Sequence, residues 1–477
     1  MSANSVIYGR EHALELLHDT LAMAMRLRHA ADAAEATLIV DNQALTRFAN
    51  NTIHQNVAQS DTRLAVRAVV DHGAGRQGVG IAVTNRLDAE GRRRLVEDAV
   101  AMARLRAPGV EGDSGGAVSS LPEGGAARPA TTFYEATAEA TAARRADAVR
   151  TIVEAARSRG YLAKGAFSTE QGELAIANSA GAEAYAPLTL ASLRTVVDAN
   201  PPAGIGLLTG YADAISRDVD DIDPAAIAAR AVEKCALNRD PQSLPPGQYV
   251  TVLEEIAVAD LLRFLGRLGL SAQAVQEGRS FAAGKMGQQV CGDNFTLWDD
   301  AADARGLALP FDWEAVPAQR LSLITRGVLE GLAYDTQTAA KEGRGSTGHA
   351  VSRIHGFGAA WPAPTHLFIA PGDVARDDLI AGVERGVLVT RFHYTHCPEP
   401  QRLVATGTTR DGTFLIEEGR IVGALKNARF TQSVLETFSN IEALSNMPEL
   451  HRDWWGSAAH CVPAMRVRDF WFTGGAD

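Results

Sequence analysis

Several features that mark common classes of protein are rare in this chain of 477 residues. Closely spaced cysteines are missing, because the four that occur stand far apart, at Cys235, Cys291, Cys397 and Cys461. Disulfide frameworks and zinc ribbons need closely spaced cysteines, so both are excluded, and a reducing compartment fits this usage best. No run of about eighteen uncharged apolar residues occurs, and no basic segment followed by an apolar core opens the chain. We therefore expect a cytoplasmic protein without a membrane partner.

Positive charge is not in excess either. The chain has 46 Lys and Arg against 57 Asp and Glu, which gives a formal net charge of -11. Binding to a phosphate backbone needs a dense basic surface, so we expect no nucleic-acid partner. We interpret the run Arg92-Arg93-Arg94 as the solvated face of a helix.

Histidine is missing from the whole middle of the chain, between His72 and His349. Many zinc peptidases hold their ion with two histidines one turn apart on a helix, next to a glutamate that serves as the base. No such helix motif can lie in that stretch.

The chain does contain ordinary globular material, with 46% hydrophobic residues, enough for two sizeable cores. Apolar residues recur at helical spacing in some segments of the first half, and alternate in short segments bounded by Asn, Asp or Gly in others. Helices are expected at 11–34, 88–106, 136–159 and 224–235. Strands are expected at 37–40, 45–48, 53–57, 64–70 and 78–84, within 162–185, and at 190–197, with turns at 41–42 and 50–51. The segment 107–130, rich in Gly, Pro, Ser and Ala, is expected to be an exposed loop.

The clearest interruption lies at 238–247, where Asp240-Pro241 and Pro245-Pro246-Gly247 break any regular structure. We therefore predict an N-terminal domain at 1–240 and a C-terminal domain at 245–477. After a helix at 256–268, the second domain consists of short β segments, with turns expected at 410–412 and 418–419. The predicted fold class is α+β: a mixed domain of helices and antiparallel sheet, followed by a β-rich domain.

The most specific signal in the sequence is a series of short blocks in a fixed order. The N-terminal block is Leu45-Thr46-Arg47-Phe48-Ala49-Asn50-Asn51 with Ile53-His54-Gln55-Asn56. The central blocks are 280–287, Pro310-Phe311-Asp312 with Val316-Pro317, Gly327-Val328-Leu329, and Gly345-Ser346-Thr347-Gly348. The closing blocks are Pro371-Gly372, 385–390, 406–412 and 414–419. In these residues and in this order, the blocks resemble the TldD/PmbA family over nearly the whole chain.

The resemblance implies one of two kinds of member: a TldD-type zinc peptidase subunit with an HExxxH helix, or a TldE/PmbA-type partner that lacks it. The stretch after the interruption reads Leu253-Glu254-Glu255-Ile256-Ala257-Val258-Ala259-Asp260, without histidine. We interpret Glu254 and Glu255 as acidic residues in the first turn of a helix, where they favour the helix dipole. We therefore expect no bound metal and no other cofactor.

The resemblance also implies that TldD-type members use a cysteine near the C-terminus as the third zinc ligand. Cys461, beside His460, lies in about that region. Because the helix histidines are missing, we interpret Cys461 as a packed thiol.

The string His393-Tyr394-Thr395-His396-Cys397-Pro398 brings three potential ligands or acid–base groups within five residues. In a strand, His393 and His396 point to opposite faces, so they converge only if a bulge or turn intervenes. Three readings stay open: a catalytic or metal role for His393, His396 and Cys397, contact with substrate, or plain packing.

The segment Arg344-Gly345-Ser346-Thr347-Gly348-His349 is a glycine-rich loop whose small residues allow a substrate to approach the backbone. It coincides with a family block, so we predict substrate contacts for Ser346, Thr347 and His349. Tyr394 and Arg410, in two other strings, complete the predicted substrate-binding set. Ser346 is a poor candidate for a nucleophile, because no base for it can be identified from the sequence.

Two functional hypotheses follow. The first is a metal-free, TldE-like subunit that pairs with a TldD-like zinc peptidase, or with a second copy of itself, and shapes the chamber in which peptides are processed. The alternative is a stand-alone homodimeric, metal-independent hydrolase or amide-bond enzyme that acts on a small molecule in a biosynthetic pathway. The His393/His396/Cys397 string and the 345–349 loop are then its candidate active site, and whether the chain is an enzyme by itself stays open.

Overall fold

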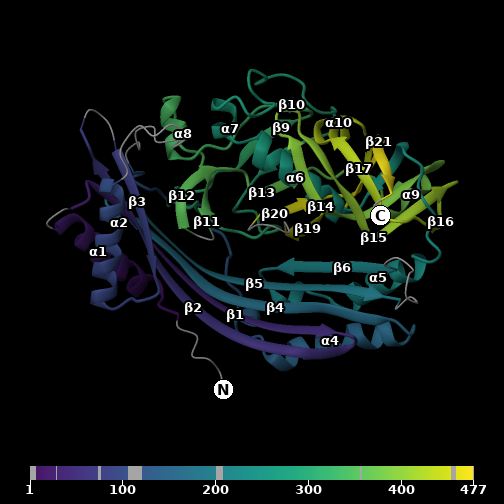
Figure 1. Ribbon diagram of the computed structural model, residues 1–477, viewed down its shortest axis with the longest axis horizontal. Helices are drawn as coiled ribbons and strands as arrows, with labels where there is room; N and C mark the ends of the chain where they lie inside the picture. The colour runs from purple at the N-terminus through teal and green to yellow at the C-terminus, as the bar shows by residue number, and fades with distance from the viewer. Residues whose placement is uncertain are drawn as a thin grey trace.

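The computed structural model describes residues 7–27, 30–73, 77–105, 121–199, 208–354, 357–452 and 458–475. Its first half contains a six-stranded antiparallel sheet in the order β3-β2-β1-β4-β5-β6 (Figure 1). The strands are β1 (Ala33–Ala49), β2 (Thr52–Asp71), β3 (Gln77–Thr84), β4 (Leu162–Asn178), β5 (Glu183–Asp198) and β6 (Thr209–Ser216). None of the described helices is long and apolar enough to cross a membrane.

Helices cover one face of this sheet. They are α1 (Arg10–Arg26), α2 (Ala89–Leu105), α3 (Glu135–Ala138), α4 (Ala142–Arg157), the short 3-10 helix η1 (Val219–Asp221) and α5 (Pro224–Leu237). The apolar sides of α1 and α2 pack on β1 to β3 around Leu38, and those of α4 and α5 pack on β4 to β6 around Leu193. The opposite face, which carries Ile39, Asp41, Glu170 and Leu174, is called the inner face below, because the C-terminal half lies against it (Figure 1).

The C-terminal half is built mainly of strands. One sheet has the order β14-β7-β21-β17-β15-β16, with β18 on β21, and an extra pairing of β14 with β15 closes five of its strands into a barrel. A second sheet has the order β10-β9-β8-β13-β20-β19, and β11 pairs with β12. The barrel strands and those joined to them are β7 (Gly247–Leu253), β14 (Arg385–Glu399), β15 (Val404–Glu417), β16 (Arg420–Ala424), β17 (Ala428–Ser433), β18 (Ile441–Leu444) and β21 (Met465–Gly475). The others are β8 (Leu297–Asp299), β9 (Leu321–Thr325), β10 (Val328–Leu329), β11 (Ala350–Ile354), β12 (Phe357–Pro362), β13 (His366–Ile369), β19 (Glu449–Arg452) and β20 (Ala459–Val462).

Short helices complete this half: α6 (Glu255–Phe264), which continues into the π-helical turn η2 (Leu265–Gly269), α7 (Ala272–Gln276), α8 (Thr336–Lys341), α9 (Arg376–Ala381) and α10 (Val434–Ser439). The largest apolar core joins α6 to the barrel, where Phe392, Phe430 and Phe470 stack on one another. The predicted α+β class, with a helix-and-sheet first half and a β-rich second half, is confirmed.

Several local predictions were wrong. The predicted helix at 11–34 ends at Arg26, because residues from Ala33 onward pair with β2 and β4. The predicted turn at 41–42 is extended chain inside β1, where partners on both sides satisfy the backbone. The turn at 50–51 is confirmed, since Asn50 and Asn51 have φ of 51° and 60°.

Two further corrections concern longer segments. The predicted helix at 136–159 is two helices, because Thr141 caps α4 by accepting a hydrogen bond from the Arg144 amide at 3.1 Å. The predicted turn at 410–412 lies inside β15, where Asp411 (φ 56°) and Gly412 (φ 137°) form a bulge opposite β14. Of the predicted loop at 107–130, residues 107–120 lie outside the described residues, and 121–130 carry no helix or strand and are mostly exposed.

Candidate functional site

The N-terminus of α6 is the first place to test, because the resemblance puts the zinc-binding helix of TldD-type members there. Glu254 and Glu255 lie at this end, as expected, and both side chains are buried. Arg376 binds Glu255 through two hydrogen bonds, Nε to Oε1 and Nη2 to Oε2, both 2.9 Å. Its Nη2 also lies 3.3 Å from Glu254 Oε1, and Lys234 of α5 forms an ion pair with the same carboxylate. Both carboxylates are thus bound by cations of the chain itself.

The charged cluster continues toward the inner face of the first sheet. Arg230 of α5 binds Glu449 of β19 through two hydrogen bonds of 2.7 Å. His451, on the same strand, lies 3.3 Å from Asp213 of β6 and 3.6 Å from Glu449. Burial alone lowers the pKa of His451, but Asp213 and Glu449 outweigh it and raise this pKa to about 10, so the imidazole is protonated at neutral pH.

Together these residues form a charge network with four cations and four anions. The cations are Lys234, Arg230, Arg376 and His451, and the anions are Glu254, Glu255, Glu449 and Asp213. Burial raises the pKa of Glu254, but Lys234 and Arg376 outweigh it and hold this pKa below its ordinary value. Since α5 and β6 belong to the first half, the network also joins the two halves.

The residues at this end of α6 do not fit a catalytic zinc ion. Such a site needs converging N, S or O ligands with an open position for water, and here an internal guanidinium occupies the front of both carboxylates. Across the described residues, no group of three or more His, Cys, Asp or Glu converges as metal ligands do. Cys461 lies on β20 and is buried, and burial raises the pKa of its thiol to about 11. Its geometry agrees with a packed thiol.

A cavity of about 270 Å³ lies between the inner face and the C-terminal half. Strands β1, β4 and β5 form one wall, and the segments around β8, the 307–318 loop, His349 and His366 form the other. The lining is mostly apolar, with a few charged groups, which is the usual composition of a binding pocket for a small molecule.

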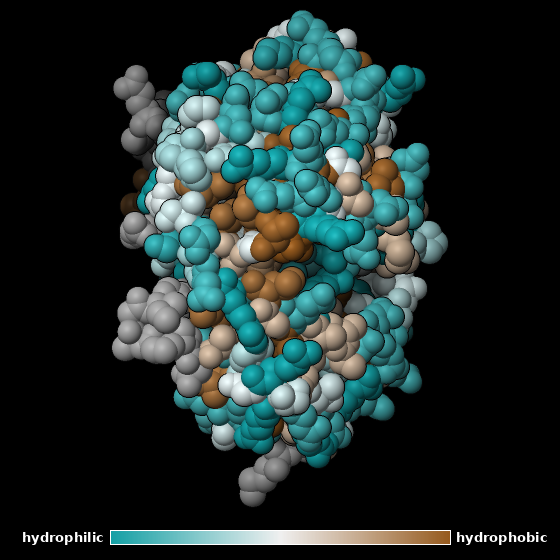
Figure 2. Space-filling view, turned by 90° about the vertical axis from the view of Figure 1, so that its right-hand side faces the viewer, coloured by the Kyte–Doolittle hydropathy of each residue, from teal (hydrophilic) through white to brown (hydrophobic). Residues whose placement is uncertain are grey.

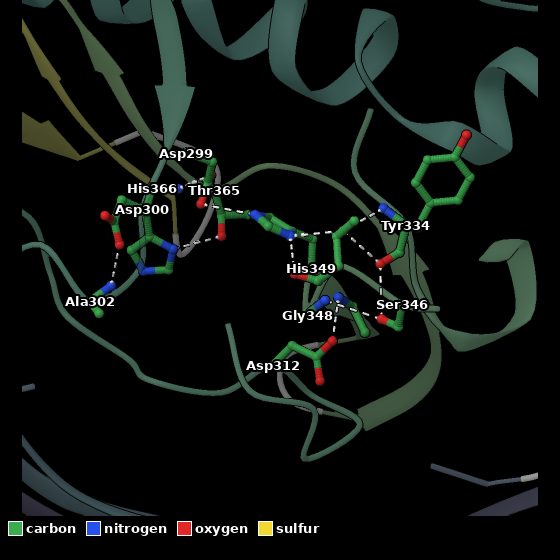
Figure 3. Close-up of polar contacts among 12 residues, drawn as sticks. Asp299, Asp300, Ala302, Asp312, Tyr334, Ser346, Gly348, His349, Thr365 and His366 are labelled. Atoms are coloured by element: carbon green, nitrogen blue, oxygen red, sulfur yellow. Dashed lines mark hydrogen bonds and ion pairs between the residues drawn. The ribbon is translucent and has the colours of Figure 1, made fainter. Parts of the chain in front are cut away.

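Side chains linked in series by hydrogen bonds line one end of this cavity (Figure 3). His349 is buried, with Nδ1 2.8 Å from the carbonyl of Thr347 and Nε2 3.2 Å from Asp299 Oδ1. The other oxygen of Asp299 accepts the backbone N–H of His366 at 2.7 Å. Burial alone lowers the pKa of His349, but the carboxylate of Asp299 outweighs it and raises the pKa. Each ring nitrogen faces an oxygen that accepts a hydrogen bond. His349 therefore has no ring nitrogen free to serve as a base.

Two more buried acids, Asp312 and Glu314, lie beside these hydrogen-bonded side chains. Asp312 accepts three backbone N–H groups, from Glu314, Val316 and Ala350, at 2.9 to 3.0 Å. Burial raises its pKa to about 6 in spite of these bonds. Burial and the charge of Asp312 raise the pKa of Glu314 to about 8, so a proton is held there near neutral pH.

The glycine-rich loop folds back on itself. Ser346 Oγ donates to the carbonyl of Tyr334 at 3.1 Å and accepts the N–H of Gly348 at 3.1 Å. The hydroxyl of Thr347 is buried and accepts the N–H of Tyr334 at 2.9 Å. Of the predicted substrate-binding residues, His349 lines the cavity, whereas the hydroxyls of Ser346 and Thr347 serve the loop itself.

The string at 393–398 lies in β14, and none of its residues lines the cavity. Its strand is irregular there, with Tyr394 at φ 49° and 76% exposed. The ring of His393 contacts that of Tyr394, and His396 Nδ1 lies 3.4 Å from the Tyr394 carbonyl. Burial and the nearby guanidiniums of Arg410 and Arg391 lower the pKa of His393, and burial raises that of Cys397 to about 11. Roles in catalysis or substrate contact for His393, His396, Cys397, Tyr394 and Arg410 stay predictions.

The sequence pattern did not single out Asp299, His366, Asp41, Glu170 or Arg217 as site residues. They come from distant segments, and only the pairing of β1, β4, β8 and β13 places them around one cavity. No local signal marks Asp41 or Glu170, because their strands carry other charged residues, among them Glu35 and Glu173.

Comparison with known proteins agrees with this geometry. Three descriptions of one family match: PmbA/TldA metallopeptidase domain 1 over residues 34–103, the central domain over 135–238 and the C-terminal domain over 246–474. A "Metalloprotease TldD homolog" of Haemophilus influenzae is 28% identical over 231 residues, which are 48% of this chain and 47% of that protein. A "Metalloprotease" of Methanothermobacter thermautotrophicus is 27% identical over 41% of this chain and 43% of its own length. The chain thus spans about half the length of the curated relatives it matches.

The fold has a close counterpart among solved structures. TldE from Thermococcus kodakarensis superposes with a TM-score of 0.84 at 20% identity, covering 97% of this chain and all of that one. The architecture and the matched segments define a peptidase-related α+β protein. The chain belongs to the TldD/PmbA family.

Proposed function

We propose that this chain is a TldE-like subunit of a TldD/TldE-type peptidase. In this proposal it carries no zinc of its own, pairs with a TldD-like zinc peptidase or with a second copy of itself, and shapes the chamber in which peptides are processed. The observation that carries the proposal is the network at α6, where Arg376 binds the two carboxylates at the position that the zinc motif takes in TldD-type members.

The chemistry of the network supports this proposal. A divalent cation at Glu254 and Glu255 would have to displace a guanidinium held by two hydrogen bonds and a lysine ammonium. Removing these cations from their partners leaves buried charges uncompensated, which costs several kcal/mol. The network therefore opposes metal binding and at the same time holds the two halves of the chain together.

The surface supports an association with another chain. Figure 2 shows apolar residues gathered near the middle of the face at the β16 and α9 end of the molecule. Strand β16 lies at the edge of its sheet, and Val422 on it is 54% exposed. Apolar patches of this kind, next to a strand edge, are common at protein interfaces.

Co-expression with a TldD-type protein encoded near this chain tests the proposal. We expect the two proteins to purify together, peptide cleavage only when both are present, and zinc in the partner but not in this chain when each is purified alone. Val422→Arg is expected to weaken the complex, whereas Val83→Arg, at a 46% exposed valine of β3 on the edge of the first sheet, is the matched control. A mixture that forms no complex and gains no peptidase activity contradicts the proposal, and so does stoichiometric zinc bound by this chain.

The cavity favours the second hypothesis, that of a stand-alone enzyme, because it lies within one chain and is lined by the Asp299–His349 pair. A stand-alone hydrolase or amide-bond enzyme acting on a small molecule would turn over its substrate without a partner. Replacing both His393 and His396 by Ala with no loss of that activity would remove these two residues from its active site.

A further inference from the structure

The cavity has an apolar wall that suits one aliphatic or aromatic side chain. Ile39 and Leu174 of the inner face lie opposite Leu309, Phe311 and Trp313 of the C-terminal half. Burial of a ligand's apolar group here removes that group from water, which favours binding. The volume of about 270 Å³ is at the lower end of the range for ligand pockets, so the ligand is small.

Two carboxylates stand on neighbouring strands of the same cavity. Glu170 of β4 accepts a hydrogen bond from Gln43 at 2.7 Å. Asp41 of β1 pairs with Gly172, which follows Glu170 on β4 by two residues, and Asp41 and Glu170 both line the cavity. Burial raises the pKa of both carboxyl groups, which means that the surrounding cations do not fully offset the cost of their charges. A cationic group on a ligand would supply the missing stabilisation.

Arg217 brings the opposite charge to the same cavity. Its Nη1 donates to the carbonyl of Thr189 at 2.9 Å and its Nη2 to that of Ala308 at 2.8 Å. Its Nε is buried and has no hydrogen-bond partner among the described residues. Burial lowers the pKa of Arg217 to about 10, so the guanidinium is still charged at neutral pH and brings positive charge to the cavity wall.

We propose that this cavity binds a zwitterionic amino acid or dipeptide with an apolar side chain. Glu170 and Asp41 bind the ammonium group, Arg217 binds the carboxylate, and the wall of Phe311 and Trp313 takes the side chain. Asp41, Glu170 and Arg217 line the same cavity of about 270 Å³, which matches a ligand whose two charged groups are separated by only a few bonds. The cavity is thus a site for small peptide pieces in addition to the chamber proposed above.

Calorimetric titration of the isolated chain with Leu-Leu tests this inference. We expect binding that weakens about tenfold or more when the peptide is N-acetylated, and again when it is C-amidated, because each change leaves a buried charge unpaired. Lys-Lys, which has no apolar side chain, is expected to bind more weakly than Leu-Leu. Equal affinity for Leu-Leu and its two blocked forms overturns the proposal, as does the absence of any binding.

Substitutions of the residues that line the cavity test whether the ligand binds there. Glu170→Gln keeps the size of the side chain and the hydrogen bond with Gln43, and is expected to weaken free Leu-Leu about tenfold while affecting the N-acetylated peptide little. Arg217→Lys is the corresponding variant for the ligand's carboxylate. Because Arg217 also donates to the carbonyls of Thr189 and Ala308, Glu170→Gln is the cleaner variant. Glu154→Gln, on the exposed side of α4, is the control and should bind as the parent does. Unchanged affinity in Glu170→Gln overturns the proposal. These measurements use the chain alone, so their failure is distinct from failure to pair with a zinc peptidase.

Discussion

Arg376 binds Glu255 with two parallel hydrogen bonds of 2.9 Å at the N-terminus of α6. A bidentate guanidinium–carboxylate pair is among the strongest polar contacts in proteins, and here it faces a second carboxylate, that of Glu254. The chain thus satisfies two buried acids with its own cations, at the place where its zinc-binding relatives are expected to hold a metal.

Arg376→Ala should destabilise the chain. It leaves two buried carboxylates without their shared cation, and breaking such a pair typically costs about 3–5 kcal/mol. Because the Arg376 side chain is 35% exposed, we expect a smaller loss, about 2–3 kcal/mol, in the free energy of unfolding by urea. Arg385→Ala is the control, since its partner Glu417 is 3.7 Å away and both are exposed, and it should stay within about 0.5 kcal/mol of the parent. Equal losses in the two variants would show that the network adds no stability.

Stability should also depend on pH through His451. The imidazole packs between Asp213 of β6 and Glu449 of β19, and Arg230 of α5 faces Glu449 from the other side. Its folded-state pKa of about 10 lies above the ordinary 6.5, so its contribution is complete below about pH 6.5 and is lost as the pH rises through 10.

The test compares the parent with His451→Gln, which is neutral at every pH. Between pH 6.5 and 10, the free energy of unfolding of the parent should fall by about 1–3 kcal/mol more than that of His451→Gln. His18→Gln, on the surface beside Glu183, should keep the slope of the parent. Parallel curves for the parent and His451→Gln would mean that the network does not hold this proton.

Stability should depend on pH through Glu314 as well, and it should again fall as the pH rises. Its folded-state pKa, about 8, lies above the ordinary 4.5, so ionisation costs stability as the pH rises from 4.5 to 8. Glu314→Gln stays neutral and keeps an oxygen that accepts the N–H of Thr336, now 2.8 Å away. We expect it to be about 1–3 kcal/mol more stable than the parent at pH 9 and to lose that advantage at pH 5. The same difference at both pH values would contradict the assigned pKa.

The sequence predicted what depends on neighbours along the chain. Asp88 to Arg106 has an uninterrupted helical period, and α2 runs from Ala89 to Leu105. The turn at Asn50-Asn51 was equally local, since asparagine tolerates the left-handed conformation. The family blocks identified the scaffold for the same reason, because each block is a short run of neighbouring residues.

What depends on distant pairing was missed. Asp41-Asn42 reads as a turn, yet β2 and β4 on either side hold it extended. Likewise, Asp411-Gly412 reads as a hairpin turn but is a bulge, held by the hydrogen bonds that the Asp411 carboxylate accepts from Thr209 and Arg391. The cavity residues follow the same rule, because Glu170 and Arg217 meet only once the sheet has formed.

The last prediction concerns the glycine-rich loop, which offers a matched pair of substitutions. Gly348 has φ 72°, and a Cβ there would lie 2.3 Å from the Pro317 carbonyl oxygen. The left-handed conformation alone costs a residue with a side chain about 1–2 kcal/mol, and the clash with backbone adds to it, so Gly348→Ala should lose about 2–4 kcal/mol of unfolding free energy. Gly345 has open space around its Cβ position, so Gly345→Ala should change stability by less than about 0.5 kcal/mol. Because Gly348 precedes His349 on the cavity wall, Gly348→Ala should also weaken Leu-Leu binding, whereas Gly345→Ala should not. Equal free energies of unfolding for Gly348→Ala and Gly345→Ala would show that the packing of this loop against Pro317 does not fix the position of the cavity wall.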